Sequence, residues 1–457
     1  MLIRFVVSNF LSFGEETEFN TFTGSPRRFK EHIYYFNDME LLKTAAIYGP
    51  NGAGKSNLVK AIGLLQQIVV KGKWDFLHDI HPFRLKSAFL DQPSNFELEF
   101  VMGGESYSYG INILKGAIAE EWLYRTHFGK KDEVVFTRTA KEGRTAITVH
   151  PQYYRTEEDR LRIKLYEEEL LKDDQPLITL MAKAKAAFKD IWLAYQWFDR
   201  HLLVVFPKTK PQFLLGRMLD QPGFQAFTNE LACSLKTGID KLELRTYDID
   251  EFFGKDDEEY ARKIKEELLK DEKGNRFVQL RTAKAGEEIL AMLENGRVVV
   301  KRLIAQHKNE KSERFDFTLE EESDGTLRLL ELIPAFFQAV YFPSTIIIDE
   351  IDQSIHPFLL KELVAKFVKD KQTKGQFLFT THESNLLDQS IFRQDEVWFA
   401  EKKPSGETAL YPLSDFDIRF DLNIQKGYLN GRFGAIPFLG NLEDLNWDVY
   451  AEEEQGV

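Results

Sequence analysis

Cysteine is almost absent from this chain of 457 residues, which contains only Cys233. One cysteine cannot form an internal disulfide, and it cannot supply a zinc site built on several thiolates. A chain without a disulfide framework is typical of a reducing compartment, so the sequence favours a cytoplasmic protein. Its length allows a large apolar core, so the fold does not depend on such cross-links.

Long apolar runs are missing as well. No segment approaches the ~18 residues that a membrane-spanning helix needs, so we expect no membrane contact. The opening residues MLIRFVVSNFLSF carry a charge at Arg4 and resemble a strand, which argues against a signal peptide. Basic residues are outnumbered, 60 against 73 acidic ones, and the net charge of −13 argues against coating nucleic acid through bulk charge.

Hydrophobic residues make up 43% of the chain and charged residues 29%, which is typical of a folded globular protein. Strand and helix patterns alternate near both ends, which predicts an α/β fold with a mixed, largely parallel sheet. We expect the domain that holds this sheet to be split, with its first part in residues 1–95 and its second in 316–457. Between them would lie an antiparallel β-subdomain in 96–150, with three strands from Phe96 to Tyr124 and a hairpin after them, and a helical insertion with closing strands in 151–315. Helical spacing predicts helices at 157–198, 223–235 and 256–270 in this insertion, and at 357–369 in the second part of the split domain.

A phosphate loop is the strongest motif. Gly49-Pro50-Asn51-Gly52-Ala53-Gly54-Lys55-Ser56 matches the full pattern G-x-x-x-x-G-K-[ST], with an apolar strand before it and an amphipathic helix after it. The glycines let backbone N–H groups turn inward toward phosphate oxygens. Lys55 is expected to reach the β- and γ-phosphates of ATP, and the Ser56 hydroxyl to hold Mg²⁺. The flanking elements disfavour a chance match in a Gly-rich turn.

A second candidate cluster follows the apolar strand Thr345 to Ile348. Ligands gather at the carboxyl ends of such buried strands, where Asp349 and Glu350 stand. Asp349 is predicted to bind Mg²⁺ directly or through water, and Glu350 to polarise the attacking water. Acids at strand ends are often only solvated, but the phosphate loop in the same chain favours catalysis. His382 ends the next strand, either as a hydrogen-bond donor to the γ-phosphate or as a capping or core residue.

The order of these motifs resembles that of ATP-binding-cassette (ABC) ATPases. Ser323-Asp324-Gly325-Thr326 stands where those proteins carry their signature loop, although Asp324 departs from the usual Leu-Ser-Gly-Gly-Gln, and a plain helix cap is the alternative. The opening Ser8-Asn9-Phe10-Leu11-Ser12-Phe13 and Asn57 are similar to the branch with SMC-like and RecF-like heads. The resemblance implies a P-loop ABC-type ATPase head.

Within that branch, the chain resembles stand-alone bacterial ATPases of abortive-infection and other antiphage systems, including the ATPase subunits of Septu and PARIS. The flanks of the chain carry this resemblance, in Ser323-Asp324-Gly325-Thr326-Leu327-Arg328, Ile348-Asp349-Glu350, Thr381-His382-Glu383-Ser384-Asn385-Leu386-Leu387 and Lys426-Gly427-Tyr428-Leu429-Asn430-Gly431-Arg432-Phe433-Gly434-Ala435-Ile436-Pro437.

The resemblance implies a composite site in a homo-oligomer. The signature loop of one subunit, through Ser323 and the Gly325 backbone, would cover the γ-phosphate that the other subunit binds. Catalysis would rest on Glu350, His382 and Lys55, with Mg²⁺ held by Ser56 and Asp349. ATP would be held by Gly49, Asn51, Gly52, Ala53, Gly54, Lys55, Ser56 and Asn57, and in trans by Ser323 and Gly325.

The resulting hypothesis is an ATP-hydrolysing sensor or switch of an antiphage system that controls a separate effector, a nuclease. The rival hypothesis is a DNA-repair ATPase of the SMC or RecF kind. A third hypothesis is a scaffold with a relic ATP site. The rival would need a longer coiled coil or a stronger basic face. Nucleic-acid contact stays open through one basic cluster, made of Arg297, Lys301, Arg302, Lys308, Lys311 and Arg314.

The tail from Glu401 to Val457 mixes many acids with apolar residues, which suits docking of a basic partner. The apolar anchors for such a partner would be Phe433, Ile436, Phe438, Leu439 and Trp447. The alternative is that the stretch from Phe433 to Leu439 packs on the parallel sheet. The chain after His382 is too short for an added Toprim nuclease domain. Asp415-Phe416-Asp417 follows a predicted strand there, and we interpret these acids as a solvated turn. We therefore expect no nuclease activity in this chain.

Overall fold

The computed structural model divides into two compact units, one made of Met1 and residues 200–378 and the other of residues 2–199 and 379–457. We call them the 200–378 unit and the phosphate-loop unit, and each is described by itself. The structure describes residues 1–24, 28–72, 80–141, 144–185, 187–207, 214–255, 257–270, 277–281, 288–420 and 422–436. Over these stretches, no helix combines the length and apolar character needed to cross a membrane.

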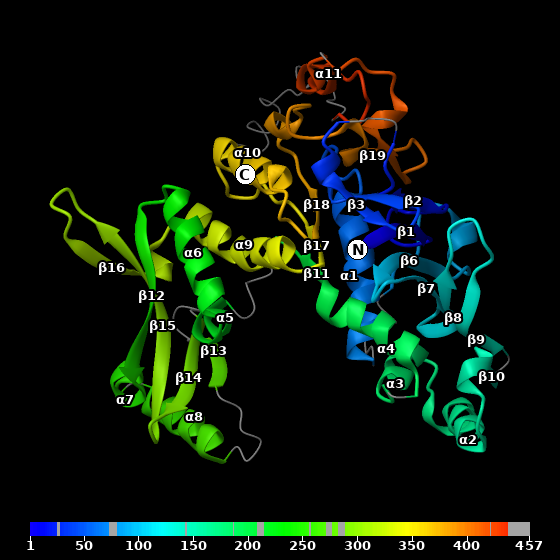
Figure 1. Ribbon diagram of the computed structural model, residues 1–457, viewed down its shortest axis with the longest axis horizontal. Helices are drawn as coiled ribbons and strands as arrows, with labels where there is room; N and C mark the ends of the chain where they lie inside the picture. The colour runs from blue at the N-terminus through cyan, green and yellow to red at the C-terminus, as the bar shows by residue number, and fades with distance from the viewer. Residues whose placement is uncertain are drawn as a thin grey trace, which may run out of the picture. The chain divides into compact units, whose positions relative to one another are not determined.

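An antiparallel sheet lies in the phosphate-loop unit (Figure 1). Alternate residues of its strand β6 are buried, as the period-two pattern predicts. The antiparallel strands expected between Phe96 and Tyr124 are confirmed, and so is the hairpin that follows them. The strand order is β10-β9-β8-β7-β6-β1-β2, with the bounds β1 Leu2–Ser8, β2 Thr17–Asn20, β6 Ser94–Met102, β7 Glu105–Leu114, β8 Ala117–Thr126, β9 Glu133–Lys141 and β10 Arg144–Val149.

Parallel strands carry the phosphate loop. Strand β5 (Thr44–Tyr48) is fully buried and pairs in parallel with β19 (Val397–Lys402), which forms an antiparallel hairpin with β20 (Thr408–Pro412). Directly after β18 (Gln376–Thr380), the N–H of Thr381 donates to the carbonyl of Ile47 in β5 at 3.0 Å. The other main elements of this unit are α1 Lys55–Lys71, β3 Ile33–Phe36, β4 Met39–Leu42, α2 Glu157–Leu165, α3 Leu177–Ala182, α4 Lys189–Gln196 and α11 Ile424–Leu429.

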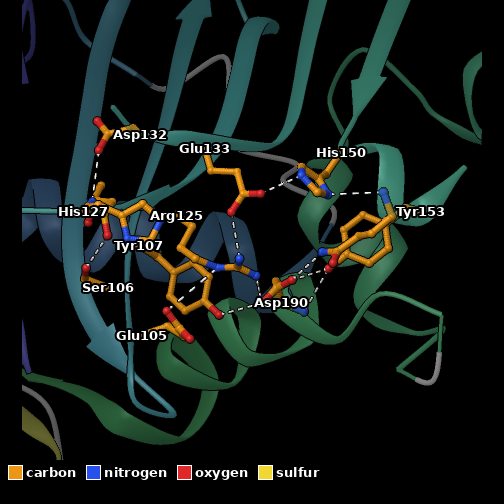
Figure 2. A network of polar contacts seen from close by, with 12 residues as sticks. Glu105, Ser106, Tyr107, Arg125, His127, Asp132, Glu133, His150, Tyr153 and Asp190 are labelled. Atoms are coloured by element: carbon orange, nitrogen blue, oxygen red, sulfur yellow. Dashed lines mark hydrogen bonds and ion pairs between the residues drawn. The ribbon is translucent and has the colours of Figure 1, made fainter. Parts of the chain in front are cut away.

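Asp190, at the start of helix α4, fastens that helix to the antiparallel sheet (Figure 2). Its carboxylate accepts hydrogen bonds from the Tyr107 hydroxyl (2.9 Å), the Tyr153 hydroxyl (2.5 Å) and Gln152 Nε2 (2.9 Å). It also pairs with the Arg125 guanidinium at 2.8 Å. Burial alone would raise the pKa of Asp190, but the hydrogen bonds from Tyr153, Arg125 and Tyr107 outweigh it and lower the pKa.

Asp190→Ala should therefore destabilise the phosphate-loop unit by about 3 kcal/mol, because several donors lose their shared buried acceptor. Because folding lowers the pKa of Asp190, its ionised carboxylate contributes its full stabilisation of the folded unit above the ordinary Asp pKa of ~3.9. This stabilisation is lost only as the pH falls below that value. Thermal unfolding and hydrogen exchange of α4 measure the effect. Asp132→Ala is the control, since it removes an exposed carboxylate that accepts from the His127 N–H. Equal stability of the two variants would contradict this role.

The 200–378 unit contains a second antiparallel sheet with helices on both faces (Figure 1). Leu290 and Leu303 pack with α5 and α6, whereas Ile289 and Ala291 pack with α7 and α8. A parallel pair, β11 with β17, belongs to the same unit. The bounds are β11 Leu202–Val205, α5 Leu214–Asp220, α6 Pro222–Ser234, β12 Ile239–Asp248, α7 Ile249–Phe253, α8 Glu258–Lys270, β13 Phe277–Arg281, β14 Glu288–Glu294, β15 Arg297–Lys308, β16 Arg314–Thr318, α9 Asp324–Tyr341, β17 Thr345–Ile348 and α10 Pro357–Lys369.

The helical pattern expected for 151–315 is only partly observed. Helices predicted at 223–235 and 256–270 are confirmed as α6 and α8. Strands β12, β13 and β14 were not predicted. In β12 only Leu242 and Leu244 alternate with charged residues, because Asp240 and Lys241 interrupt the pattern after Ile239, so the strand signal is short.

The long helical stretch predicted for 157–198 is divided into α2, α3 and α4. The chain between α2 and α3 instead binds the antiparallel sheet. The buried guanidinium of Arg138 donates to the carbonyls of Lys172 (3.0 Å) and Gln175 (2.6 Å). The next residue, Pro176, has no N–H to continue a helix, so α3 starts afresh at Leu177.

Candidate nucleotide-binding site

The phosphate loop joins β5 to α1, as the sequence predicts. Gly52 (φ 78°) and Gly54 (φ 107°) have left-handed backbones that glycine adopts without strain. A Cβ on Gly54 would also lie 2.0 Å from Thr408 Oγ1, so no other residue fits there without displacing that side chain. At Gly49 a Cβ would lie 2.3 Å from the carbonyl oxygen of Ala400 in β19. These close contacts fix the backbone of the loop at the N-terminus of α1. A helix N-terminus favours bound anions.

Lys55 is the first residue of α1, and only 4% of it is exposed. Its ammonium donates to the carbonyls of Gly49 (2.7 Å) and Pro50 (3.2 Å), and its Nζ lies 3.4 Å from His382 Nδ1. The structure thus brings together two predicted site residues from distant parts of the sequence. A cation held at the loop provides the charge that a bound phosphate needs.

A chain of hydroxyl and amide groups supports the loop from outside. Asn57 Nδ2 donates to Ser12 Oγ at 2.8 Å, and Thr408 Oγ1 lies 2.8 Å from both Ser12 Oγ and the Ala53 carbonyl oxygen. Asn57 and Ser12 belong to motifs that the sequence singles out. Thr408 was missed, because a threonine at the start of a hairpin strand carries no motif.

A pocket of about 380 Å³ opens beside this chain of groups. The loop that lines it is anchored by Asn9, whose side chain accepts from the Phe83 N–H (3.0 Å) and donates to the carbonyls of Phe89 (2.8 Å) and Gln92 (2.9 Å). Asn9, which belongs to the opening motif Ser8 to Phe13, therefore holds the loop that forms one wall of the pocket. The pocket is lined by Leu11, Ser12, Asn57, His81, Pro82, Phe83, Arg84, Leu85, Lys402 and Gly406.

The predicted acids lie in the 200–378 unit, at the end of β17. Asp349 is buried, and its N–H donates to the carbonyl of Val205 at 2.8 Å. Glu350 has a left-handed backbone (φ 51°), which is uncommon for a residue with a side chain and recurs at functional sites. The placement of both acids relative to Lys55 and Ser56, and hence a shared Mg²⁺ site, stays a prediction.

The signature-like segment lies in the same unit as these acids. Ser323 caps α9, because its Oγ accepts from the N–H of Thr326 at 3.2 Å. The cap is confirmed, and it is compatible with the signature role that the resemblance implies. A Cβ on Gly325 would lie 2.7 Å from the carbonyl oxygen of Ser354, so glycine lets α9 approach the loop after Glu350. Ser323 itself is exposed at the start of an 18-residue helix.

The basic cluster has less unpaired positive charge for binding nucleic acid than its sequence indicates. Lys308 (2.6 Å) and Arg314 (2.9 Å) both pair with Asp240, and Lys301 lies 3.4 Å from Glu294. Acids of neighbouring strands thus offset much of its charge, which weakens it as a nucleic-acid surface.

The described residues near the C-terminus pack against β19, in the part of the chain where the sequence also allowed a docking surface for a partner. Phe433 is buried and stacks on Phe399 of β19, with ring centroids 5.9 Å apart. Tyr428 stacks on the same ring at 5.6 Å. The alternative of packing on the sheet is therefore correct for Phe433, whereas Phe438, Leu439 and Trp447 lie outside the described residues.

Comparisons with known proteins identify a family for this chain. The family model described as "AAA domain, putative AbiEii toxin, Type IV TA system" matches residues 45–159 and 236–388, more than half of the chain. No curated protein matches. Among solved structures, the "SMC head domain from Thermotoga maritima" is similar with 13% identity and a TM-score of 0.35, over 90% of this chain and 98% of that chain.

A second similar structure is described as "Crystal structure of the SmcHead bound to the C-winged helix domain of ScpA". It has 12% identity and a TM-score of 0.40, over 90% of this chain and 97% of that chain. The residues matched by the family model include the phosphate loop, Ser323, Asp349, Glu350 and His382. The chain therefore belongs to this AAA family, and its fold is that of a P-loop ATPase.

Proposed function

We propose that the protein binds ATP with Mg²⁺ at the phosphate loop and hydrolyses it in a site shared by two copies. The observation that carries this proposal is the buried Lys55 ammonium, held 2.7 Å from the Gly49 carbonyl at the start of α1. Loop N–H groups and Lys55 would bind the β- and γ-phosphates. His382, 3.4 Å from Lys55, would donate a hydrogen bond to the γ-phosphate.

The acids complete the proposed chemistry. The Ser56 hydroxyl and the Asp349 carboxylate are oxygen ligands of the kind that Mg²⁺ prefers, and the bound ion would neutralise phosphate charge. Glu350 would orient and polarise the attacking water. Ser323 and the Gly325 backbone of a second copy would cover the γ-phosphate, aided by the N-terminus of α9.

The pocket beside the loop supports a nucleotide as the ligand. Its volume of about 380 Å³ falls within the usual range for ligand pockets. Asn57, directly after the phosphate loop, forms part of its wall, and Leu11 and Phe83 add apolar surface. We propose that the base and ribose occupy this pocket.

If two heads close on ATP through Ser323, Glu350→Gln with ATP should increase self-association. Adding Ser323→Arg should reverse it, because a bulky cation would obstruct the facing phosphate loop. Sedimentation velocity measures the shift. Crosslinking across the interface between the Lys55 loop and the Ser323 segment, with cysteines placed at neither of these two residues, detects the interface even in a constitutive oligomer. Glu320→Arg, an exposed change near the same helix, is the control. An association state that ignores both nucleotide and Ser323 would contradict the composite site.

We further propose that ATP binding switches a separate effector, a nuclease, in antiphage defence. The family description names a toxin and a TA system, which supports a role in a toxic response. The pairing of the basic cluster with acids disfavours the rival, a DNA-repair ATPase.

The purified chain should leave DNA and RNA intact with Mg²⁺ or Mn²⁺, with or without nucleotide. Co-expression with the product of the adjacent gene should yield a complex, and phage-dependent toxicity should need both Lys55 and that partner. Cleavage by the lone chain that is lost on Asp415→Asn and Asp417→Asn, outside the ATP site, would overturn this role.

A further inference from the structure

The hydroxyl of Thr408 contacts the phosphate loop at Ala53. Thr408 is only 2% exposed, and its Oγ1 lies 2.8 Å from the Ala53 carbonyl oxygen and 2.8 Å from Ser12 Oγ. Its backbone N–H donates to the carbonyl of Ser12 at 2.8 Å. Strand β20 is thus tied to the opening segment of the chain and to the loop at once.

Thr408 Oγ1 donates toward two acceptors, the Ala53 carbonyl oxygen and Ser12 Oγ, each at 2.8 Å, which share its single hydroxyl proton. Ser12 Oγ also accepts from Asn57 Nδ2 at 2.8 Å. These contacts form a relay of Asn57, Ser12, Thr408 and Ala53, and it connects the first turn of α1 with the loop before it.

The relay also sets the orientation of one peptide group. In a planar trans peptide, the carbonyl of one residue and the N–H of the next point in opposite directions. With the Ala53 carbonyl directed at Thr408, the N–H of Gly54 points away from Thr408. The missing side chain of Gly54 leaves room for this contact, since a Cβ there would lie 2.0 Å from Thr408 Oγ1.

We propose that Thr408 is a positioning residue for ATP, which turns the Ala53–Gly54 peptide so that the Gly54 N–H faces the bound phosphates. This inference rests on the proposed ATP site. Thr408 does not touch the reacting atoms, and it acts through the loop. The alternative is a purely structural role, in which the buried Thr408 only stabilises the hairpin of β19 and β20.

Thr408→Val keeps the shape and removes the hydroxyl, whereas Thr408→Ser keeps the hydroxyl. We expect Thr408→Val to raise KM for ATP and the Kd of ADP about 10-fold, the cost of one hydrogen bond, with kcat nearly unchanged. Thr408→Ser should stay within about 2-fold of wild type. Ser12→Ala should weaken binding too, and the double variant Ser12→Ala with Thr408→Val should bind no worse than Thr408→Val alone, because the two groups act in one relay.

A purely structural role would lower the melting temperature and the active fraction without moving KM. Unchanged KM and Kd in Thr408→Val, or no rescue by Thr408→Ser, would overturn the proposal. If Thr408→Val does not fold, Ser12→Ala alone decides, because unchanged nucleotide affinity in that variant would overturn the relay. A wild-type protein that binds no ATP would refute the ATP site itself, which is a separate outcome.

Discussion

Lys55→Met should weaken ATP binding by more than ~100-fold and abolish turnover with it. The side chain keeps its length but loses the ammonium that the loop holds 2.7 Å from the Gly49 carbonyl. Truncating one partner of a buried, hydrogen-bonded charge pair costs about 2–5 kcal/mol, and the phosphates would lose such a partner here. Isothermal titration with ATP and a phosphate-release assay measure the two effects.

The matched control is Lys60→Met on the same helix. Lys60 is exposed on α1, so the substitution removes an equal charge without touching the loop. It should leave the affinity for ATP and the turnover close to wild type. Wild-type affinity in Lys55→Met would mean that nucleotide does not bind through this loop.

The sequence predicts the elements that depend on local patterns. The apolar run that becomes β17 and the helix α10, which Pro357 begins, agree with the structure in their bounds. The strand before the phosphate loop and the helix after it are also confirmed, because their glycines and apolar spacing act within one short segment. Such patterns need no information from the rest of the fold.

Other features arise from contacts that no local pattern encodes. Thr408 reaches Ser12 across 396 positions, and neither residue type is unusual where it stands. Phe433 looks like an exposed anchor in the sequence, but Phe399 supplies the ring on which it stacks. Strand β14 is stabilised by helices on both faces, and those helices come from separate segments of the chain. Tertiary packing therefore decides these positions.

The contact between Lys55 and His382 lies between these two cases. The sequence places each residue separately at the γ-phosphate, Lys55 through the phosphate loop and His382 through its position at a strand end, where ligands bind. In the structure Lys55 Nζ lies 3.4 Å from His382 Nδ1. The same argument predicts that Asp349 and Glu350 complete the site, and a kinetic experiment can test that prediction.

Glu350→Gln should bind ATP with nearly wild-type affinity yet hydrolyse it about 10²- to 10⁴-fold more slowly, the usual contribution of a positioned general base. Glutamine keeps the size of the side chain and the left-handed backbone at this position, so the loop after β17 should be preserved. Single-turnover phosphate release gives the chemical step, and titration with ATP gives the affinity. Glu362→Gln, an exposed carboxylate of α10 in the same unit, should leave both quantities unchanged. Equal rates for Glu350→Gln and wild type would remove Glu350 from the mechanism, and another group would have to activate the water.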